Sequence, residues 1–149
     1  MNDITRVRLG ACGWLHPAWR EAFYPADMPE EWQLTFFNTQ FNCVYLEASF
    51  WQAAAPEELL RWYADTHDQF LFLLEWAVAA PVELADKALL IRPGDPSVLW
   101  FFHDSSLKEL ASVLKAGVVG RPRYLISRDG DLTQIERVAT LLEVLGLGQ

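Results

Sequence analysis

The sequence is poor in basic residues and in long apolar runs, and each scarcity excludes a class of protein. Its 12 lysines and arginines stand against 20 acidic residues, which gives a formal net charge of −8 at pH 7. Nucleic acids and anionic membranes bind basic surfaces, so neither is an expected partner. No apolar run reaches the ~18 residues that a membrane-spanning helix needs. Residues 1–6 are polar and charged and lack the apolar core of a secretory signal. We therefore expect a cytoplasmic protein.

Cysteine is also scarce, and the common nucleotide-binding and hydrolase motifs are missing. The chain has 2 cysteines, Cys12 and Cys43, and no histidine adjoins either, so no zinc motif is indicated. In a cytoplasmic protein both thiols are expected to be reduced, and Cys12 is more typical of a small buried residue than of a nucleophile. Residues 10–13, Gly-Ala-Cys-Gly, lack the third glycine of a dinucleotide-binding turn. Neither a phosphate-binding Gly-Lys-Ser/Thr nor a Gly-x-Ser-x-Gly elbow is found.

Apolar and aromatic residues are plentiful. They make up 52% of the 149 residues, and 7 of them are tryptophan, so the chain can build a core without disulfides or metals. Disorder is not expected at this composition. The length favours one domain, which we place at residues 1–149.

Strands and helices alternate along the chain. We expect five strands, at residues 7–12, 43–47, 70–75, 98–102 and 123–126. We expect helices at 29–40, from Pro56 onward, at 81–91, at 105–117 and at 131–146. Residues 70–75 are apolar on both faces, as in a buried parallel strand. The alternation predicts an α/β fold with about five parallel strands and right-handed crossovers.

The first half of the chain resembles the YecE-like family, which is also described as domain of unknown function 72. The motifs that carry the resemblance are Gly13-Trp14, Trp19-Arg20, Tyr24-Pro25, Phe50-Trp51, Trp62 and Phe70-x-Phe72. The resemblance implies a TIM-type (β/α)₈ barrel, but such a barrel takes ~250 residues. We therefore predict a truncated, TIM-barrel-like half-barrel or an open flavodoxin-like sheet. Either leaves two sheet edges, which a homodimer would cover.

Three positions depart from the pattern that the resemblance implies. Tyr45 stands where the family usually has Glu, Glu47 where it has Asn, and Glu75 where it has Lys. In a barrel these side chains would face the centre near the carboxyl ends of the strands. The family's own chemistry is therefore not expected to be retained here.

Ligands of parallel α/β folds bind at the carboxyl ends of the strands. The residues expected there are Cys12, Trp14, Glu47, Ser49, Glu75, Trp76, His103, Asp104, Ser127, Arg128 and Asp129. From this set and the aromatic loop we select Glu47, Glu75 and His103 as candidate catalytic residues and Trp14, Trp19, Asp104 and Arg128 as candidate binding residues.

Three interpretations of these residues remain open. Glu47, Glu75 and His103 or Asp104 are suitable ligands for a divalent metal such as Mn, Mg or Zn. The same acids are also suited to acid/base catalysis. The simplest interpretation is that they are polar strand ends, hydrogen-bonded to loops or to Arg20 and Arg128. His16, in the loop before Pro17, is expected to be solvated.

Two functions from different classes follow. The first is a divergent, catalytically inactive binding or interaction module that forms a homodimer. The second is an enzyme that carries out metal-assisted or acid/base chemistry on a small polar molecule. Convergence of the carboxylates and His103 would favour the enzyme, and separate partners for each would favour the module.

Overall fold

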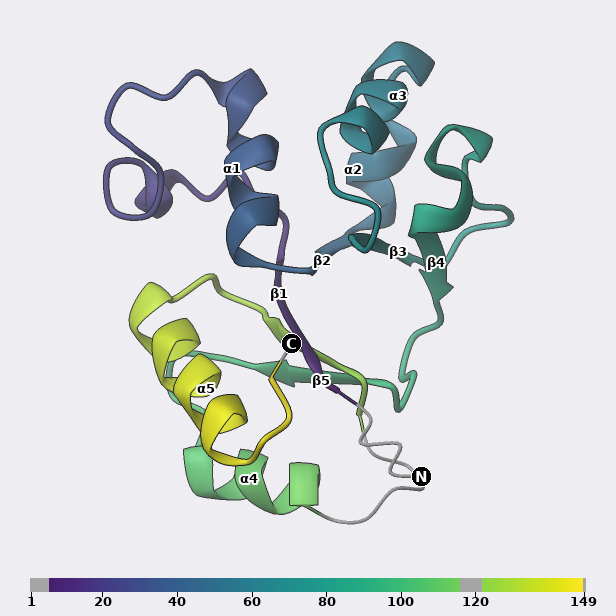
Figure 1. Ribbon diagram of the computed structural model, residues 1–149. Coiled ribbons are helices and arrows are strands. Elements are labelled where there is room, and N and C mark those ends of the chain that lie inside the picture. Colours follow the sequence, from purple (N-terminus) through teal and green to yellow (C-terminus); the bar gives the residue numbers. More distant parts are fainter. Residues whose placement is uncertain (1–5, 116–121, 149) are drawn as a thin grey trace.

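The computed structural model describes residues 6–115 and 122–148 and shows a curled, all-parallel six-stranded sheet (Figure 1). The strands are β1 (Arg8–Cys12), β2 (Cys43–Leu46), β3 (Leu71–Glu75), β4 (Ala88–Ile91), β5 (Val98–Phe101) and β6 (Tyr124–Ser127). The α-helices are α1 (Gln33–Gln40), α2 (Ala48–Gln52), α3 (Pro56–Ala64), α4 (Leu107–Lys115) and α5 (Leu132–Val144). Short 3₁₀ helices are η1 (Pro17–Trp19), η2 (Glu30–Trp32) and η3 (Val82–Lys87).

The strand order is β4-β3-β2-β1-β6-β5, which confirms the predicted half-barrel. The first strand, β1, pairs with both β2 and the last strand, β6, as the first and last strands of a closed barrel do. The seam lies between β4 and β5, which follow one another in the chain and form the two edges of the sheet. Residues 92–97 link these two edges. The sheet has the arrangement of a barrel that lacks its middle strands.

The helix predicted at residues 81–91 is wrong. This segment forms η3, which is interrupted at Ala85 with a φ of 47°, and then the strand β4. Leu89 and Leu90 of β4 pair in parallel with Leu73 and Leu74 of β3. A short apolar run does not distinguish a buried helix from a strand, and pairing with the free edge of β3 decides the outcome. The sheet therefore has six strands rather than five.

The predicted helix starts are largely correct. Pro56 begins α3, with Glu57 and Glu58 in its first turn, where acids complement the helix dipole. Asp131 caps α5, because its carboxylate accepts a hydrogen bond of 2.8 Å from the backbone N–H of Gln134. The predicted end of the helix at 105–117 lies outside the described residues.

The outer face of the sheet carries the larger core. Its fully buried aromatic residues include Trp19, Phe37, Phe70 and Phe72. Trp19 lies nearly parallel to Phe37, with ring centroids 6.0 Å apart. The Trp19 indole N–H donates a 2.7 Å hydrogen bond to the Gly130 carbonyl, which ties the N-terminal loop to the turn after β6. The aromatic loop after β1 therefore belongs to the outer core.

The inner face of the sheet carries a smaller apolar cluster, which side chains from distant strands close. Tyr45 of β2 meets Trp100 of β5 edge to face, with ring centroids 4.7 Å apart, although β1 and β6 lie between these strands. Gly10 of β1 leaves room for this layer: a Cβ there would lie 2.8 Å from Cys43 Sγ and nearer still to the Cys43 carbonyl oxygen. The curl of the sheet thus brings side chains from both halves into contact.

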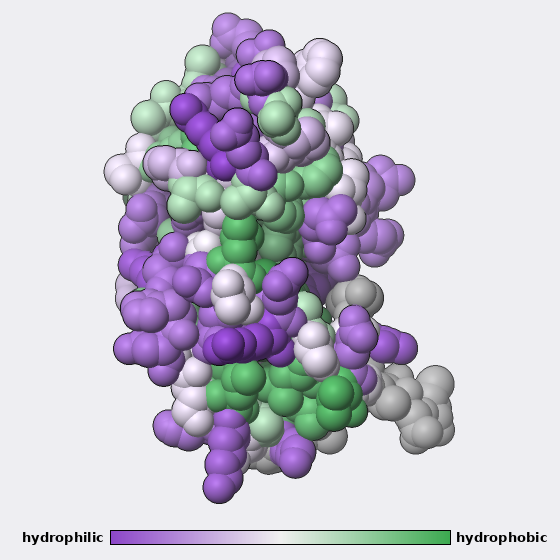
Figure 2. Space-filling view, turned by 90° about the vertical axis from the view of Figure 1, so that its left-hand side faces the viewer, coloured by the Kyte–Doolittle hydropathy of each residue, from purple (hydrophilic) through white to green (hydrophobic). Residues whose placement is uncertain are grey.

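Figure 2 looks onto the side of the molecule where the N-terminal loop, α1 and α5 lie. Hydrophilic residues cover much of this face, a narrow apolar column runs through its upper middle, and a broader apolar patch lies lower down, at the level of α4 and α5. Val113 of α4 and Val144 of α5 are 42% and 76% exposed. Among the described residues, no helix is long and apolar enough to cross a membrane.

Candidate functional site

Polar residues gather at the carboxyl ends of β1, β2, β3 and β6, where the sequence places the site. Burial raises the pKa of the Cys12 thiol, while the positive charge of Arg128 opposes this and the charges of Glu47 and Glu75 add to it. Burial, with Glu75 next in weight, raises the pKa of Tyr45 to about 12. Both groups are therefore protonated at neutral pH, and Cys12 is not an activated nucleophile.

Glu75 has a structural partner. Its Oε1 accepts a 2.8 Å hydrogen bond from the backbone N–H of Ala48, the first residue of α2. The Glu75 carbonyl oxygen accepts a second bond, of 3.3 Å, from the Trp51 indole N–H of the same helix. The side chain and the backbone of Glu75 thus hold α2 against the end of β3.

Glu47 faces Arg128 rather than Glu75. The Glu47 Oε2 lies 4.0 Å from the Arg128 guanidinium, and the two side chains are 54% and 42% exposed. Arg128 also stacks over Trp100, with its Cζ 4.5 Å from the ring centroid. Exposed ion pairs of this length contribute little to stability. Arg128 thus has two contacts, the ion pair with Glu47 and the stacking on Trp100.

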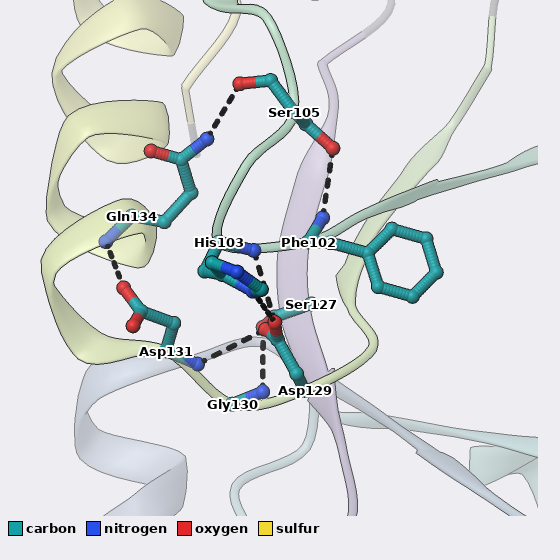
Figure 3. Close-up of polar contacts among 8 residues, drawn as sticks. All are labelled: Phe102, His103, Ser105, Ser127, Asp129, Gly130, Asp131 and Gln134. Carbon is teal, nitrogen blue, oxygen red and sulfur yellow. Dashed lines mark hydrogen bonds and ion pairs between the residues drawn. The ribbon is translucent and has the colours of Figure 1, made fainter.

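His103 is paired with Asp129, as Figure 3 shows. One carboxylate oxygen, Oδ2 of Asp129, lies 2.8 Å from His103 Nδ1 and accepts a 2.9 Å bond from the His103 backbone N–H. The hydrogen bond to Asp129, followed by the charge of Asp104, raises the pKa of His103. Burial alone would raise the pKa of Asp129, but the bonds from His103 and from the Asp131 backbone leave it below its ordinary value.

A short network connects this pair to α5. The Gln134 side-chain amide donates a 2.9 Å bond to the Ser105 carbonyl, and the Ser105 hydroxyl accepts one of 2.9 Å from the Phe102 backbone (Figure 3). The Ser127 hydroxyl accepts a 3.0 Å bond from the Gly130 N–H. The loops after β5 and β6 are thereby held together, and the His103 ring is 65% exposed beside them.

The predicted metal site is not assembled. Glu75 binds the start of α2, Glu47 faces Arg128, and His103 binds Asp129, so the three predicted catalytic residues have separate partners. Asp104 is exposed next to His103. Among the residues that the structure describes, no group of three or more His, Cys, Asp or Glu side chains is placed to hold a metal ion.

The loop residues chosen as ligand contacts are core residues. Trp14 is 4% exposed and Trp19 is 0% exposed, and Trp14 contributes to the wall of the cavity at the ends of β1 and β2. The expectation that His16 is solvated is also wrong, because its ring packs on Trp19 with centroids 4.3 Å apart. His16 Nε2 is sealed without a hydrogen-bond partner, and burial lowers the pKa of this histidine.

A cavity of about 170 Å³ opens at the ends of β1 and β2. Cys12, His16, Tyr45, Glu47 and Phe50 contribute to its walls. It is smaller than the 300–1,000 Å³ that is usual for a small-molecule site. Tyr45, where the resemblance implies Glu, places an aromatic ring in this wall.

Sequence reasoning missed two partners within the site. The sequence identifies Asp129 as a strand-end residue, but its pairing with His103 joins residues that are 26 positions apart. The sequence indicates Trp100 only as part of an apolar strand, although it contacts both Tyr45 and Arg128. The alternation of inward and outward side chains along β5 was the available signal for Trp100.

Comparisons with known proteins bear on ancestry alone. Residues 8–123 match a family described as protein of unknown function DUF72. Searches of curated proteins and of solved structures returned no match. The matched segment includes all the motifs that carry the YecE-like resemblance and five of the six strands. The chain therefore belongs to the DUF72 family.

Proposed function

We propose that this protein is a non-catalytic binding module that acts as a homodimer. The observation that carries the proposal is the contact between Tyr45 and Trp100, which fills the space where the inner face of an open barrel would receive a substrate. The separate partners of Glu47, Glu75 and His103 support it, because acid/base or metal chemistry needs such groups to converge.

The two sheet edges are the surface that we assign to the second copy. Each of β4 and β5 has a strand neighbour on one side only. Leu89 on β4 is 43% exposed, and Phe102, directly after β5, is 44% exposed. Unpaired strand edges with apolar side chains are prone to pair with another chain, and a two-fold dimer covers equivalent edges on both copies.

Sedimentation and light scattering of the wild type and of Leu89→Lys test the dimer. We expect a dimeric mass for the wild type and at least a tenfold weaker association for the variant, because a charge at the edge must be desolvated. Val144→Lys is the matched control, since Val144 is 76% exposed and belongs to α5 rather than to either edge strand. A monomeric wild type, or a dimer that only the control disrupts, would reject the edge interface.

Metal analysis of the purified protein tests the alternative of a metal-assisted enzyme. A non-catalytic module should carry no stoichiometric Mn, Mg or Zn after gel filtration without chelator. A metal bound at one equivalent and lost in Glu47→Gln or Glu75→Gln would overturn the proposal in favour of the metal-assisted enzyme.

A second candidate function is acid/base catalysis by His103, and the Asp129 bond favours it. A carboxylate at Nδ1 orients an imidazole and raises its basicity, which leaves Nε2 for a substrate. Hydrolysis of a small activated ester by the wild type and by His103→Gln distinguishes the two candidates. A turnover that is lost in His103→Gln and reduced in Asp129→Asn supports the enzyme, and equal rates in all three proteins reject it.

A further inference from the structure

A cavity of about 460 Å³ lies outside the barrel, between the N-terminal loop and the start of α1. The residues that matter for its chemistry are Arg20, Glu21, Tyr24, Asp27, Glu30 and Gln33. Tyr24 forms a firm wall, because it is 2% exposed and its hydroxyl donates a 2.6 Å bond to the Trp14 carbonyl. The Trp19-Arg20 and Tyr24-Pro25 motifs of the DUF72 resemblance thus build this cavity, which the proposed dimer does not use.

Gln33 is the unusual residue of the cavity. It is 6% exposed, yet its side-chain amide makes no hydrogen bond within the described part of the chain. Buried polar groups almost always have hydrogen-bond partners. Among the described residues only His16 Nε2 is sealed from solvent without a partner. The Gln33 amide is therefore reached from the cavity and offers one acceptor and two donor hydrogens to a ligand.

The charge around Gln33 favours a cation. Glu21, Asp27 and Glu30 contribute three carboxylates to the lining, against the single guanidinium of Arg20. None of these four residues belongs to an ion pair with another described residue. All four side chains are exposed, so their charges are accessible to a ligand as well as to solvent.

The backbone holds two of these acids in an uncommon conformation. Glu21 and Asp27 both have a φ of 63°, which is the left-handed region that favours glycine. A non-glycine residue in this region is strained relative to glycine. The loop thus keeps carboxylates at two positions where glycine would stabilise the fold, and both positions line the cavity.

We propose that this cavity binds a small organic cation, through a guanidinium or alkylammonium group whose N–H donors meet the carboxylates and the Gln33 oxygen. The volume is within the usual range for small-molecule sites. A guanidinium offers five donors that suit several carboxylates at once. A metal ion is a poorer fit, because no three carboxylates of the described residues converge on one point. The cation is either a free small molecule or a side chain of a peptide.

Calorimetric titration with arginine amide and with citrulline amide tests the charge requirement. These probes have nearly the same shape, but citrulline carries an uncharged urea in place of the guanidinium. We expect one saturable site for arginine amide and at least tenfold weaker binding of citrulline amide. No saturation by arginine amide up to about 10 mM would overturn the proposal, and so would equal affinity for the two probes.

Gln33→Leu locates the site and separates binding from folding. We expect at least tenfold weaker binding of arginine amide, with stability nearly unchanged, because Gln33 makes no side-chain hydrogen bond to another described residue that the variant could lose. Gln52→Leu, at an exposed glutamine of α2, is the matched control and should bind normally. A large loss of stability in Gln33→Leu would show that the amide has a structural role and would overturn the assignment.

Two further probes distinguish the source of the cation. Tighter binding of agmatine than of a capped Gly-Arg-Gly peptide indicates a free small molecule, and the reverse order indicates a peptide side chain. Both orders support the cation site. The site is also independent of the dimer, so Leu89→Lys should bind arginine amide with unchanged affinity, and a parallel loss of both properties would contradict the separation.

Discussion

The two faces of the sheet differ in how they are covered and in what they share with the family. The outer face is covered by helices and by the N-terminal loop, and Trp19, Phe37 and Phe72 are completely buried there. No described helix or loop covers the inner face, where Tyr45 and Trp100 meet each other across the curl of the sheet. The outer core is packed between the sheet and the helices, whereas the inner core is closed by side chains of the sheet itself.

The residues that reveal ancestry lie on the outer side, and two that depart from the family pattern lie on the inner side. Trp14, Trp19, Trp62 and Phe72 all belong to the outer core, whereas Tyr45 belongs to the inner cluster and Glu75 ends β3 at its rim. Packing between layers restrains the outer residues, because any change leaves a cavity or a clash. The residues that carry the family resemblance and two of the residues that depart from it therefore lie on opposite faces of the sheet.

The largest effect is expected from Trp19→Ala on the outer face. The variant removes a fully buried indole and its hydrogen bond to the Gly130 carbonyl, so it should cost about 4–5 kcal/mol of unfolding free energy. Urea denaturation followed by circular dichroism measures the loss. Trp32→Ala is the control, since Trp32 is 61% exposed and should change stability by less than about 0.5 kcal/mol. Similar losses in both variants would contradict the buried role of Trp19.

Tyr45→Ala on the inner face should cost less, about 3 kcal/mol, at the lower end for a buried aromatic residue. The inner layer is open at its rim, so Trp100 and Arg128 can move into the space. Tyr45→Phe keeps the ring and should be nearly neutral, because no hydrogen bond of the Tyr45 hydroxyl to a described residue is seen. If Tyr45→Ala is more damaging than Trp19→Ala in the same urea assay, the ranking of the two faces is reversed.

Glu75→Lys restores the residue type that the family resemblance implies and should cost about 1–2 kcal/mol. The change removes the acceptor for the Ala48 N–H and places a cation at the start of α2. Glu75→Gln keeps an acceptor and should lose roughly half as much. Glu136→Lys, on the exposed side of α5, is the control for the charge change. Equal stability of Glu75→Lys and wild type, by thermal unfolding, would mean that Glu75 does not brace α2.

Much of the fold was predictable because it depends on local pattern. Pro56 and Asp131 mark helix starts through the missing N–H of one and the side-chain acceptor of the other, and the structure confirms both. The strand β4 was not predictable, because Leu89 and Leu90 acquire their conformation from pairing with β3. The half-barrel was predicted from the chain length together with the family resemblance. Neither is a property of any single segment.

The site was less predictable, because its partners come from distant segments. The sequence correctly suggests that Glu47, Glu75 and His103 follow strands, but it cannot show which group each one meets. Trp19 shows how ambiguous a loop aromatic is, since its position suggests a ligand contact while the structure buries it completely in the core. The only sequence feature that could have indicated Gln33 as a cavity residue is its position, as a polar residue at the start of an apolar helix face.

The smallest effect is expected at the exposed rim, from Asp129→Asn. Because Asp129 raises the folded-state pKa of His103, its contribution is fully present below the unfolded histidine value, about 6.5, and is lost as the pH rises through the folded value. The folded-state pKa of Asp129 is lowered, so on the acid side the contribution disappears as the pH falls through that value. Urea denaturation at pH 5.5 and pH 8.5 should therefore show a larger deficit for Asp129→Asn at pH 5.5. Asp104→Asn, which leaves the hydrogen bond intact, should show a weaker pH dependence. A deficit that is equal at both pH values would mean that the loops are held by the backbone hydrogen bonds of Asp129 alone. The charge of His103 would then contribute nothing to stability, as in the uncharged cores of the two faces.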